Sequence, residues 1–385
     1  MRRLISAEQM LHPDGVLAPG WVVVQGERIA HAGRGTPPSD VSSTDDTIQT
    51  QILSPGFVDG HCHGGAGSAF SDVDAVATRH TLRAQRSGGA TSVVASVVTA
   101  PLDDLRRQVE SLADLVESGE LAGIHLEGPW LSPHFAGAHA PHLLLEPTPR
   151  DIQTLLDAGR GHLTMVTLAP ELPGGMDAVR QLSKAGVVVA IGHTDADFDT
   201  TRNAADAGAS VVTHLFNAMR PVHHRAPGPV VAALNDERLL IELVADGHHV
   251  DPTVLALAAR SARGGFSLVS DAMAAAQAPP GRYRLGALEV DVGSDGLPRL
   301  VGTEQIAGST LTMDHAVRVM VAAGLPLSSV LAAATSRPAA ALGLTDVGRL
   351  SAGHRADLVL LSTELEVQGV MRSGEWQPRG ERHAG

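Results

Sequence analysis

Little in this 385-residue sequence points to a secreted, membrane-bound or nucleic-acid-binding protein. The single cysteine, Cys62, excludes an internal disulfide. No apolar run is as long as a membrane span, and the N-terminal residues lack the apolar core of a signal peptide. Basic residues number 29 against 42 acidic ones, and a net charge of −13 disfavours a nucleic-acid partner. We therefore expect a cytoplasmic protein that binds neither membranes nor nucleic acid.

The shortage of positive charge does not exclude a phosphorylated small molecule as a ligand. One arginine and a few backbone N–H groups are enough to hold a phosphate group. Lysine is nearly absent, since Lys184 is the only one in the chain. A charged contact to phosphate is therefore expected from arginine.

The middle of the chain alternates between apolar strands and helices. Eight runs predict strands, most of them rich in valine and isoleucine: 52–61, 91–99, 121–128, 162–169, 187–194, 210–217, 239–247 and 266–272. Helices are expected between them, for example at 72–87, 102–118, 175–185, 198–207 and 252–262. Strands that are apolar throughout are buried on both faces, as in a parallel sheet. Eight strand–helix units predict a closed (β/α)8 barrel over residues 54–347.

The two ends of the chain follow a different pattern. Residues 1–53 and 348–385 contain short β runs separated by glycine and polar turns, and neither piece could bury a core alone. We expect the two ends to pair into one small β-sandwich domain. The predicted fold class is therefore α/β, a TIM-type barrel with a small β domain.

Side chains that can bind metals follow several of the predicted barrel strands. In a barrel the carboxyl ends of the strands meet at one mouth, where active sites form. We therefore predict a single metal-dependent site at this mouth. Its six candidate residues are His61, His63, Glu127, His193, His214 and Asp271.

The first strand ends in two histidines separated by one residue. In an extended strand His61 and His63 share a face, and Cys62 points away. Two imidazoles on one side form half of a zinc-type site. Taken alone, the pattern is equally typical of surface histidines in a glycine-rich loop, and the other strand ends favour the metal.

Each of the other candidates also has a simpler structural interpretation. A lone histidine at a strand end, such as His193 or His214, is commonly a hydrogen-bonded structural residue. Glu127 could belong to an ion pair, although no basic residue is near it in sequence. Asp271 could be the N-cap of a helix. Its place at the last strand end favours a proton shuttle between water and a leaving amine.

Seven motifs, in this order, resemble those of the N-acetylglucosamine-6-phosphate deacetylases of the amidohydrolase superfamily. They are PGFVDGHCHG, HLEGPWLSP with GAH after it, GHTDA, THLFNAM, ADGHHV, VSDAMAAA and AGSTLTMD, and they extend from Pro55 to Asp314. PGFVDGHCH alone would indicate only the superfamily. The resemblance implies hydrolysis of N-acetylglucosamine 6-phosphate to glucosamine 6-phosphate and acetate.

The resemblance also implies roles for individual residues. Glu127, His193 and His214 would bind the catalytic metal, and the first-strand histidines make a second metal plausible. The cofactor would be one or two divalent ions per chain, with zinc expected before iron, manganese or cobalt. Arg225 would bind the phosphate in the neighbouring subunit of a homodimer. The other implied substrate contacts are His139, Asn217, Ala218 and His249.

Of three alternative functions, the first stays open and the other two are disfavoured by the sequence. The sequence does not exclude the same chemistry on N-acetylgalactosamine 6-phosphate. A dihydroorotase-like enzyme is disfavoured, because many of these bridge two metals through a carboxylated lysine after the fourth strand, where this chain has Thr167-Leu168-Ala169-Pro170. An inactive binding barrel is disfavoured by the complete set of ligand candidates together with Asp271.

Overall fold

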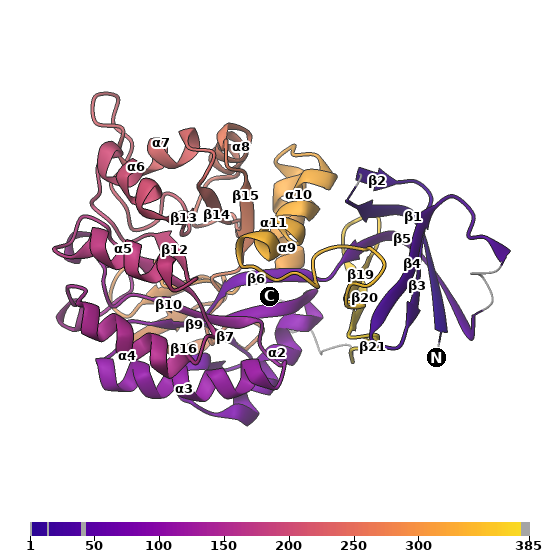
Figure 1. Ribbon diagram of the computed structural model, residues 1–385, viewed down its shortest axis with the longest axis horizontal. Helices are drawn as coiled ribbons and strands as arrows, with labels where there is room; N and C mark the ends of the chain where they lie inside the picture. Colours follow the sequence, from indigo (N-terminus) through magenta and orange to yellow (C-terminus); the bar gives the residue numbers. More distant parts are fainter. Residues whose placement is uncertain (1, 14, 40–43, 379–385) are drawn as a thin grey trace.

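The computed structural model describes residues 2–13, 15–39 and 44–378, which form a barrel and a separate terminal sheet (Figure 1). Eight parallel strands pair in the order β15-β14-β13-β12-β11-β10-β9-β6. Backbone hydrogen bonds from His63 N to Ala272 O (2.7 Å) and from Asp271 N to His61 O (2.8 Å) link the two outer strands of this order. The predicted barrel is thereby confirmed. Its strands are β6 (Phe57–Cys62), β9 (Ala90–Val98), β10 (Gly123–Glu127), β11 (Leu163–Leu168), β12 (Val188–Ile191), β13 (Ala209–Val212), β14 (Leu240–Val244) and β15 (Phe266–Val269).

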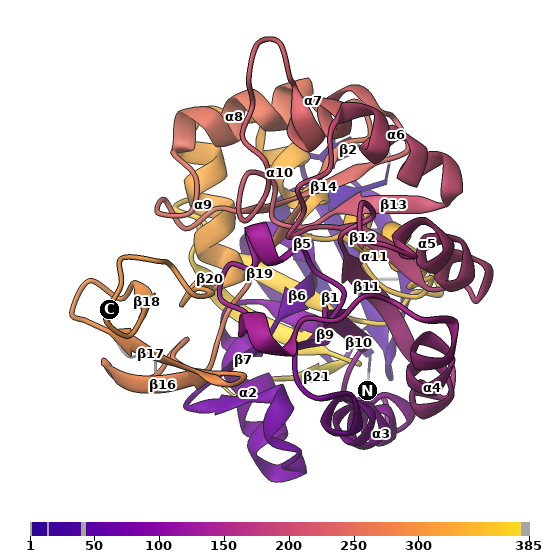
Figure 2. The ribbon, with the colours of Figure 1, turned by 90° about the vertical axis from the view of Figure 1, so that its left-hand side faces the viewer.

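Helices surround the barrel strands, as the view along the barrel shows (Figure 2). They form because apolar residues recur every three or four positions: α3, for example, buries Leu105, Val109 and Leu112. Side chains such as Asp74 and Asp197 accept hydrogen bonds from the first free backbone N–H groups. The helices are α2 (Ala75–Ser87), α3 (Leu102–Glu117), α4 (Pro149–Gly159), α5 (Gly175–Lys184), α6 (Phe198–Ala207), α7 (Gly228–Asn235), α8 (Pro252–Ser261), α9 (Met313–Ala322), α10 (Leu327–Ala333) and α11 (Ser336–Ala341), with short 3-10 turns at Phe70–Asp72, Pro133–Phe135 and Pro141–Leu143. None of the described helices is both long and apolar enough to cross a membrane.

The two ends of the chain meet in one eight-stranded sheet, ordered β21-β20-β19-β5-β1-β3-β4 with β2 paired to β1. Its N-terminal and C-terminal parts join where β5 and β19 pair, with Leu53 opposite Leu360. Ile5, Val22 and Met371 are fully buried in its own small core. The expected pairing of the two ends is therefore confirmed. The strands are β1 (Arg2–His12), β2 (Gly15–Leu17), β3 (Gly20–Gln25), β4 (Arg28–Arg34), β5 (Asp46–Pro55), β19 (Leu358–Leu361), β20 (Val367–Arg372) and β21 (Glu375–Trp376).

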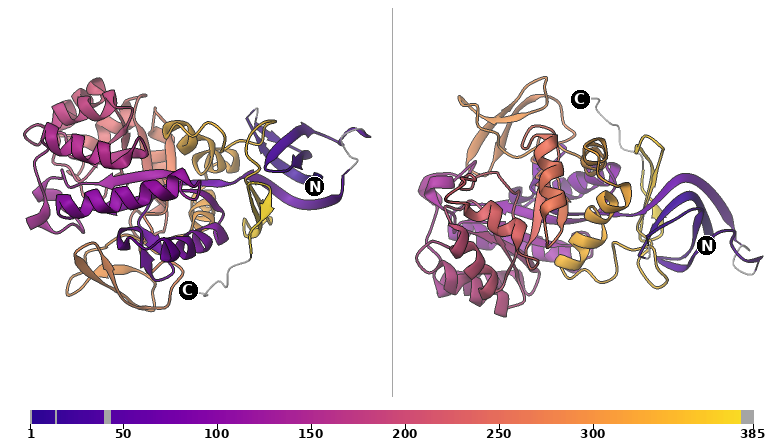
Figure 3. Two further views of the ribbon diagram at one scale, coloured as in Figure 1. Left: turned by 60° about the horizontal axis from the view of Figure 1, so that its bottom comes forward. Right: turned by 90° about the horizontal axis from the view of Figure 1, so that it is seen from above.

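A three-stranded antiparallel sheet is inserted after the last barrel strand, and the sequence analysis did not predict it. It contains β16 (Gly281–Leu285), β17 (Leu288–Val292) and β18 (Pro298–Leu300), and it stands on one flank of the barrel (Figure 3). Leu285 and Val290 pack in one cluster with Val98 and Met273. Because Val98 ends β9 and Met273 follows β15, this insert lies beside the barrel mouth. A two-stranded ribbon, β7 (Gly64–Gly65) and β8 (Ser68–Ala69), follows β6.

Candidate metal centre

The six predicted residues lie together at the carboxyl ends of the barrel strands. His61 lies on β6 and Glu127 on β10, and His63 directly follows β6. The other three come two residues after β12, β13 and β15. All six are buried, with exposed fractions between 0 and 7 %. The structure therefore places His61, His63, Glu127, His193, His214 and Asp271 in one buried cluster.

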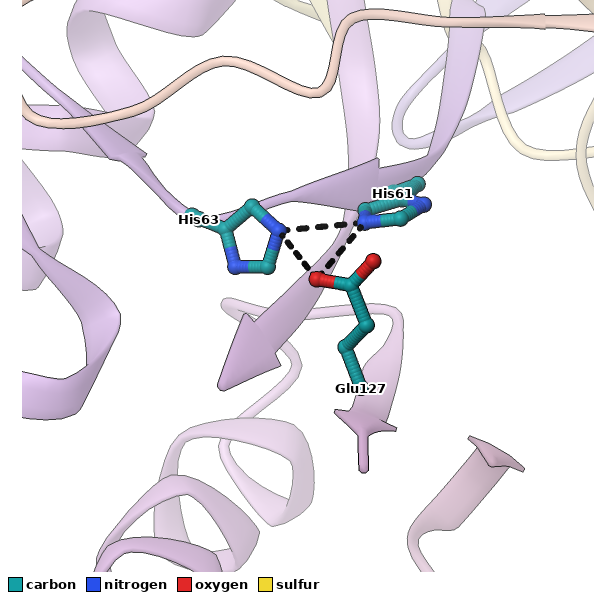
Figure 4. Close-up of side chains that lie close together, drawn as sticks. All are labelled: His61, His63 and Glu127. Atoms are coloured by element: carbon teal, nitrogen blue, oxygen red, sulfur yellow. Dashed lines mark hydrogen bonds and ion pairs between the residues drawn. The ribbon is translucent and has the colours of Figure 1, made fainter. Parts of the chain in front are cut away.

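Glu127 lies at the centre of this cluster, and its two carboxylate oxygens face different histidines. Oε1 lies 3.0 Å from Nε2 of His193 and 3.0 Å from Nε2 of His214. Oε2 lies 3.2 Å from Nε2 of His63 and 3.7 Å from Nε2 of His61 (Figure 4). A carboxylate with this arrangement can bridge two adjacent cation positions.

The donor set fits a divalent metal better than a hydrogen-bonded network. The Nε2 atoms of His193 and His214 lie 3.1 Å apart, and those of His61 and His63 lie 3.0 Å apart. Nδ1 of His193 lies 3.0 Å from the carbonyl oxygen of Phe135, which can only accept a hydrogen bond. The proton of a neutral His193 ring is thus on Nδ1, and the Nε2 lone pair faces the cluster. Inward lone pairs and a buried carboxylate repel each other unless a cation lies between them.

The electrostatics of the two acidic groups reflect the histidines around them. Burial alone would raise the pKa of Glu127. In the cluster without a cation, the charge of His61 and hydrogen bonds from His139 and His193 outweigh burial and hold that pKa well below its usual range. Burial would likewise raise the pKa of Asp271, but a hydrogen bond from His63 and the charge of His61 lower it. Both carboxyl groups are therefore held as anions, the form that binds cations.

Asp271 lies between the histidine pair of β6 and the rim of the site. Oδ1 lies 3.3 Å from Nε2 of His63, and Oδ2 lies 4.0 Å from Nε2 of His249. No helix begins at Asp271, since Ala272 forms isolated bridges and residues 274–277 form turns. The helix N-cap interpretation of this residue is therefore wrong.

Three of the six residues have left-handed backbone conformations, which are uncommon for side chains other than glycine. The φ angles are 47° at His193, 26° at His214 and 49° at Asp271. Each lies two residues past a barrel strand, where the chain turns sharply into its loop. Such strain persists where surrounding contacts over-determine it and is concentrated at functional sites.

Two further predicted residues, His139 and His249, border the cluster. Nε2 of His139 lies 3.4 Å from Oε2 of Glu127, and its Nδ1 lies 2.8 Å from the hydroxyl of Thr99. Nδ1 of His249 lies 2.6 Å from Oδ2 of Asp246. Each ring is therefore held at its Nδ1 side and directs Nε2 toward a carboxylate of the cluster.

The predicted phosphate-binding residues lie on the loop between β13 and α7, which projects from the barrel (Figures 1 and 2). The Asn217 amide donates to the carbonyl of His214 at 3.1 Å, and the carbonyl of Ala218 accepts from Thr194 N at 3.2 Å. These bonds fix the start of the loop to the site. Arg225 is exposed, with Nη1 2.7 Å from Nε2 of His224. Within the described residues no contact joins Arg225 to the cluster.

Four buried or half-buried residues support the cluster and were missed by the sequence analysis. Three of them lie close in sequence to a predicted residue. His125 comes two residues before Glu127 on the same strand face, Asp59 two residues before His61, and Asp246 three residues before His249. The fourth, on β14, contacts His61 of β6 past the intervening strand β15, and no local pattern indicates it. In that order the four are His125, Asp59, Asp246 and Glu242.

Asp59 illustrates how these supporting residues act. Its carboxylate accepts hydrogen bonds from the Ser270 hydroxyl at 2.5 Å, from Ser270 N at 3.1 Å and from His61 N at 3.3 Å. Complete burial raises its pKa to about 6, against the lowering effect of those hydrogen bonds. Asp59 thus connects the backbone of His61 with the residue before Asp271.

A model of the amidohydrolase family matches residues 52–377 of this chain. The match covers most of the barrel and the return into the terminal sheet. The chain therefore belongs to the amidohydrolase family.

Relatives and solved structures narrow the similarity further. An N-acetylgalactosamine-6-phosphate deacetylase of Escherichia coli O157:H7 is 35 % identical over 382 residues, 97 % of this chain and 99 % of the relative. The N-acetylglucosamine-6-phosphate deacetylase of Homo sapiens is 39 % identical over 349 residues, 85 % of this chain and 84 % of the relative. A variant of the Mycobacterium smegmatis N-acetyl-D-glucosamine-6-phosphate deacetylase, in complex with N-acetyl-D-glucosamine-6-phosphate, superposes with a TM-score of 0.94 at 46 % identity, covering 97 % of this chain and 99 % of that one.

The position of Lys184 argues against a lysine-bridged metal pair. Lys184 is exposed in the last turn of α5, outside the ring of strands. Strand β11 ends at Leu168, and the residues after it are Ala169 and Pro170. Glu127 lies instead between two histidine pairs, with Oε1 3.0 Å from Nε2 of His193 and Oε2 3.2 Å from Nε2 of His63.

Proposed function

We propose that this chain hydrolyses the acetamide bond of N-acetylglucosamine 6-phosphate, releasing acetate and glucosamine 6-phosphate. The observation that carries this proposal is the buried cluster around Glu127, with Asp271 beside it. A proton-transferring carboxylate next to a set of metal ligands is the arrangement that metal-dependent amide hydrolysis uses. The similarity to deacetylases of this substrate over nearly the whole chain supports the same reaction.

The residues that would hold the cofactor fall into two groups that share Glu127. His193 and His214 with Oε1 of Glu127 form the first position, and His61 and His63 with Oε2 form the second. Histidine and carboxylate ligands suit zinc, which is the ion we propose, and they also accept iron, manganese or cobalt. A bound divalent ion lowers the pKa of water and polarises a carbonyl group.

Asp271 moves the proton in the proposed reaction. Its carboxylate takes a proton from the attacking water as the new C–O bond forms at the acetyl carbon. The same proton passes from Asp271 to the sugar nitrogen as the C–N bond breaks, which gives acetic acid and the free amine. The acid then loses its own proton to the amine, so the products are acetate and the ammonium form of the sugar, and atoms and charge balance. The distances of 3.3 Å to His63 and 4.0 Å to His249 place this carboxylate between the ligands and the rim.

The substrate contacts would come from the rim and the projecting loop. His139 and His249 direct Nε2 toward Glu127 and Asp271, where they can contact the sugar and the acetyl oxygen. Asn217 and the backbone of Ala218 would receive the phosphate close to the cluster. Arg225 would complete the phosphate site of the neighbouring subunit in a cytoplasmic homodimer, since it is exposed and pairs with no carboxylate among the described residues.

N-acetylgalactosamine 6-phosphate is a second candidate substrate. The specific observation in its favour is the relative from Escherichia coli O157:H7, which aligns over 97 % of this chain. The two sugars differ only in the configuration at one ring carbon, far from the acetamide bond. Both would therefore use the same cluster and the same proton transfer.

Acetate release from a panel of N-acetylhexosamine 6-phosphates tests this proposal. Protein purified without chelator, with its metal content measured, should release acetate and a primary amine in equal amounts. N-acetylglucosamine 6-phosphate should give the highest kcat/KM. A higher value for the galactosamine epimer would favour the second candidate, and no acetate from any member would refute the deacetylase assignment.

A further inference from the structure

His61 differs from the other histidines of the cluster in the partner of its outer ring nitrogen. Its Nδ1 lies 3.3 Å from Oε2 of Glu242 on β14. Both side chains are buried, with exposed fractions of 0 and 3 %. An ionised carboxylate only accepts hydrogen bonds, so Nδ1 of His61 must donate. In the neutral ring the lone pair is then on Nε2, the nitrogen that faces Glu127 and His63.

A second contact holds the plane of the same ring. The His125 ring packs edge-to-face against His61, with ring centroids 4.6 Å apart and an interplanar angle of 81°. His125 is itself fixed at both nitrogens, with Nδ1 2.9 Å from the Ser96 hydroxyl and Nε2 2.8 Å from the Thr167 hydroxyl. Rotation of His61 would thus break its bond to Glu242 and collide with a ring that is held in place.

The other three histidines lack such a carboxylate. Nδ1 of His193 donates to a neutral carbonyl oxygen, that of Phe135. Nδ1 atoms of His63 and His214 are buried without a hydrogen-bond partner in the part of the chain that the structure describes. A carboxylate behind a ligand histidine orients the ring and makes it a stronger donor to metal. This support is therefore concentrated on the His61 side of the cluster.

We propose that Glu242 is the positioning residue of the His61–His63 position and sets the affinity with which that position holds a divalent metal. The inference rests on the proposed function in taking the cluster as a metal centre. Without the carboxylate, Nδ1 of His61 has no acceptor and the proton can move to Nε2, where it blocks metal binding. Among the described residues the Glu242 carboxylate forms no hydrogen bond or ion pair with His193 or His214. The metal affinity of the position built from these two histidines should therefore be unaffected.

Metal binding to the full-length chain tests the proposal without any substrate. Chelator-treated wild type, Glu242→Leu and Glu242→Gln are dialysed against stepped concentrations of free Zn²⁺, and bound metal is counted by mass spectrometry. Titration with Co²⁺, followed by visible absorption, reports the ligand environment. Asp314→Asn is the matched control, because Asp314 is an equally buried carboxylate that pairs with Arg318 instead of a ligand histidine.

The expected result is that Glu242→Leu binds the first metal as wild type does and the second about 10- to 100-fold more weakly. Glu242→Gln should lose less, because its amide oxygen can still accept from Nδ1 of His61. If the leucine variant does not fold by circular dichroism, the glutamine variant decides. Wild-type affinity for the second metal in the folded variants overturns the proposal, as does a wild-type chain that never binds more than one ion. Failure to release acetate would refute the proposed function alone, because metal counts do not depend on the substrate.

Discussion

His214 of the buried cluster around Glu127 and Arg225 of the loop at 221–226 lie close together in sequence but differ in almost every physical respect. His214 is buried, and its Nε2 lies 3.0 Å from Oε1 of Glu127. Arg225, eleven residues later, is exposed and contacts only the neighbouring His224 by its side chain among the described residues. The cluster satisfies its ligand geometry within one chain. The loop presents an exposed cation that pairs with no carboxylate among the described residues, and in the proposed function this cation would contribute to the site of a neighbouring subunit.

The largest expected effect is at Asp271, on the buried side of this comparison. Asp271→Asn cannot accept a proton, so kcat should fall at least ~10²-fold, the usual contribution of a positioned acid–base group. Metal content and substrate affinity should stay close to wild type, since none of the ligand atoms is removed. Steady-state kinetics with metal analysis measures all three. Near-normal turnover of the asparagine variant would remove Asp271 from the reaction.

The next effect sharpens the comparison within the cluster itself. Replacing His61 and His63 together with alanine should reduce the bound metal from two ions to one, because Glu127 retains the other histidine pair. Cys62→Ala is the control, since Cys62 lies between the two histidines and its buried thiol donates to Gly64 O at 3.5 Å. Its metal count should equal that of wild type. Equal counts in all three proteins would show that the first-strand histidines hold no ion.

A smaller effect is expected on the exposed side. Arg225→Ala should raise KM for the 6-phosphate, because the substrate loses a charge-assisted pair whose binding free energy is ~1.5–3 kcal/mol. Activity on unphosphorylated N-acetylglucosamine, which we expect to be much weaker, should change little. Comparing kcat and KM on the two sugars provides the measurement. Equal losses on both sugars would exclude Arg225 as the phosphate contact.

The smallest effect concerns stability. Because Arg225 is exposed and makes no ion pair with a carboxylate among the described residues, Arg225→Ala should change the free energy of unfolding by no more than about 0.5 kcal/mol. Denaturant unfolding of both proteins at the same concentration tests this. A larger loss would mean that the loop packs against a surface that stabilises the fold, and the contrast with the buried cluster would weaken.

The sequence predicted the parts of the molecule in which local pattern and topology agree. Apolar strands such as β9, buried at all nine positions, indicated a parallel barrel, and the barrel then brought distant residues such as His61 and Glu127 together. It could not predict the contact of Glu242 with His61, because strands β14 and β6 are not neighbours in the sheet and no spacing relates the two residues.

The inserted sheet β16–β18 also escaped prediction, for a different reason. Its strands are short and carry exposed polar residues between less exposed ones, as Arg282 and Arg284 do on either side of Tyr283, so they resemble polar loops.

The left-handed conformations of His193 and Asp271 likewise have no sequence signal, because histidine and aspartate are not diagnostic of positive φ. These features depend on contacts formed only in the folded barrel.

Subunit complementation is the most direct test of the proposed arrangement, in which the buried cluster of one subunit works together with Arg225 of the neighbouring subunit. Asp271→Asn chains lack the proton shuttle but carry Arg225, whereas Arg225→Ala chains carry Asp271. Unfolded and refolded together in equal amounts, they should form mixed dimers in which one site has both groups, restoring about a quarter of wild-type activity at low substrate if pairing is random. Activity no greater than the sum of the separately refolded variants, in samples shown to contain mixed dimers, would contradict this arrangement.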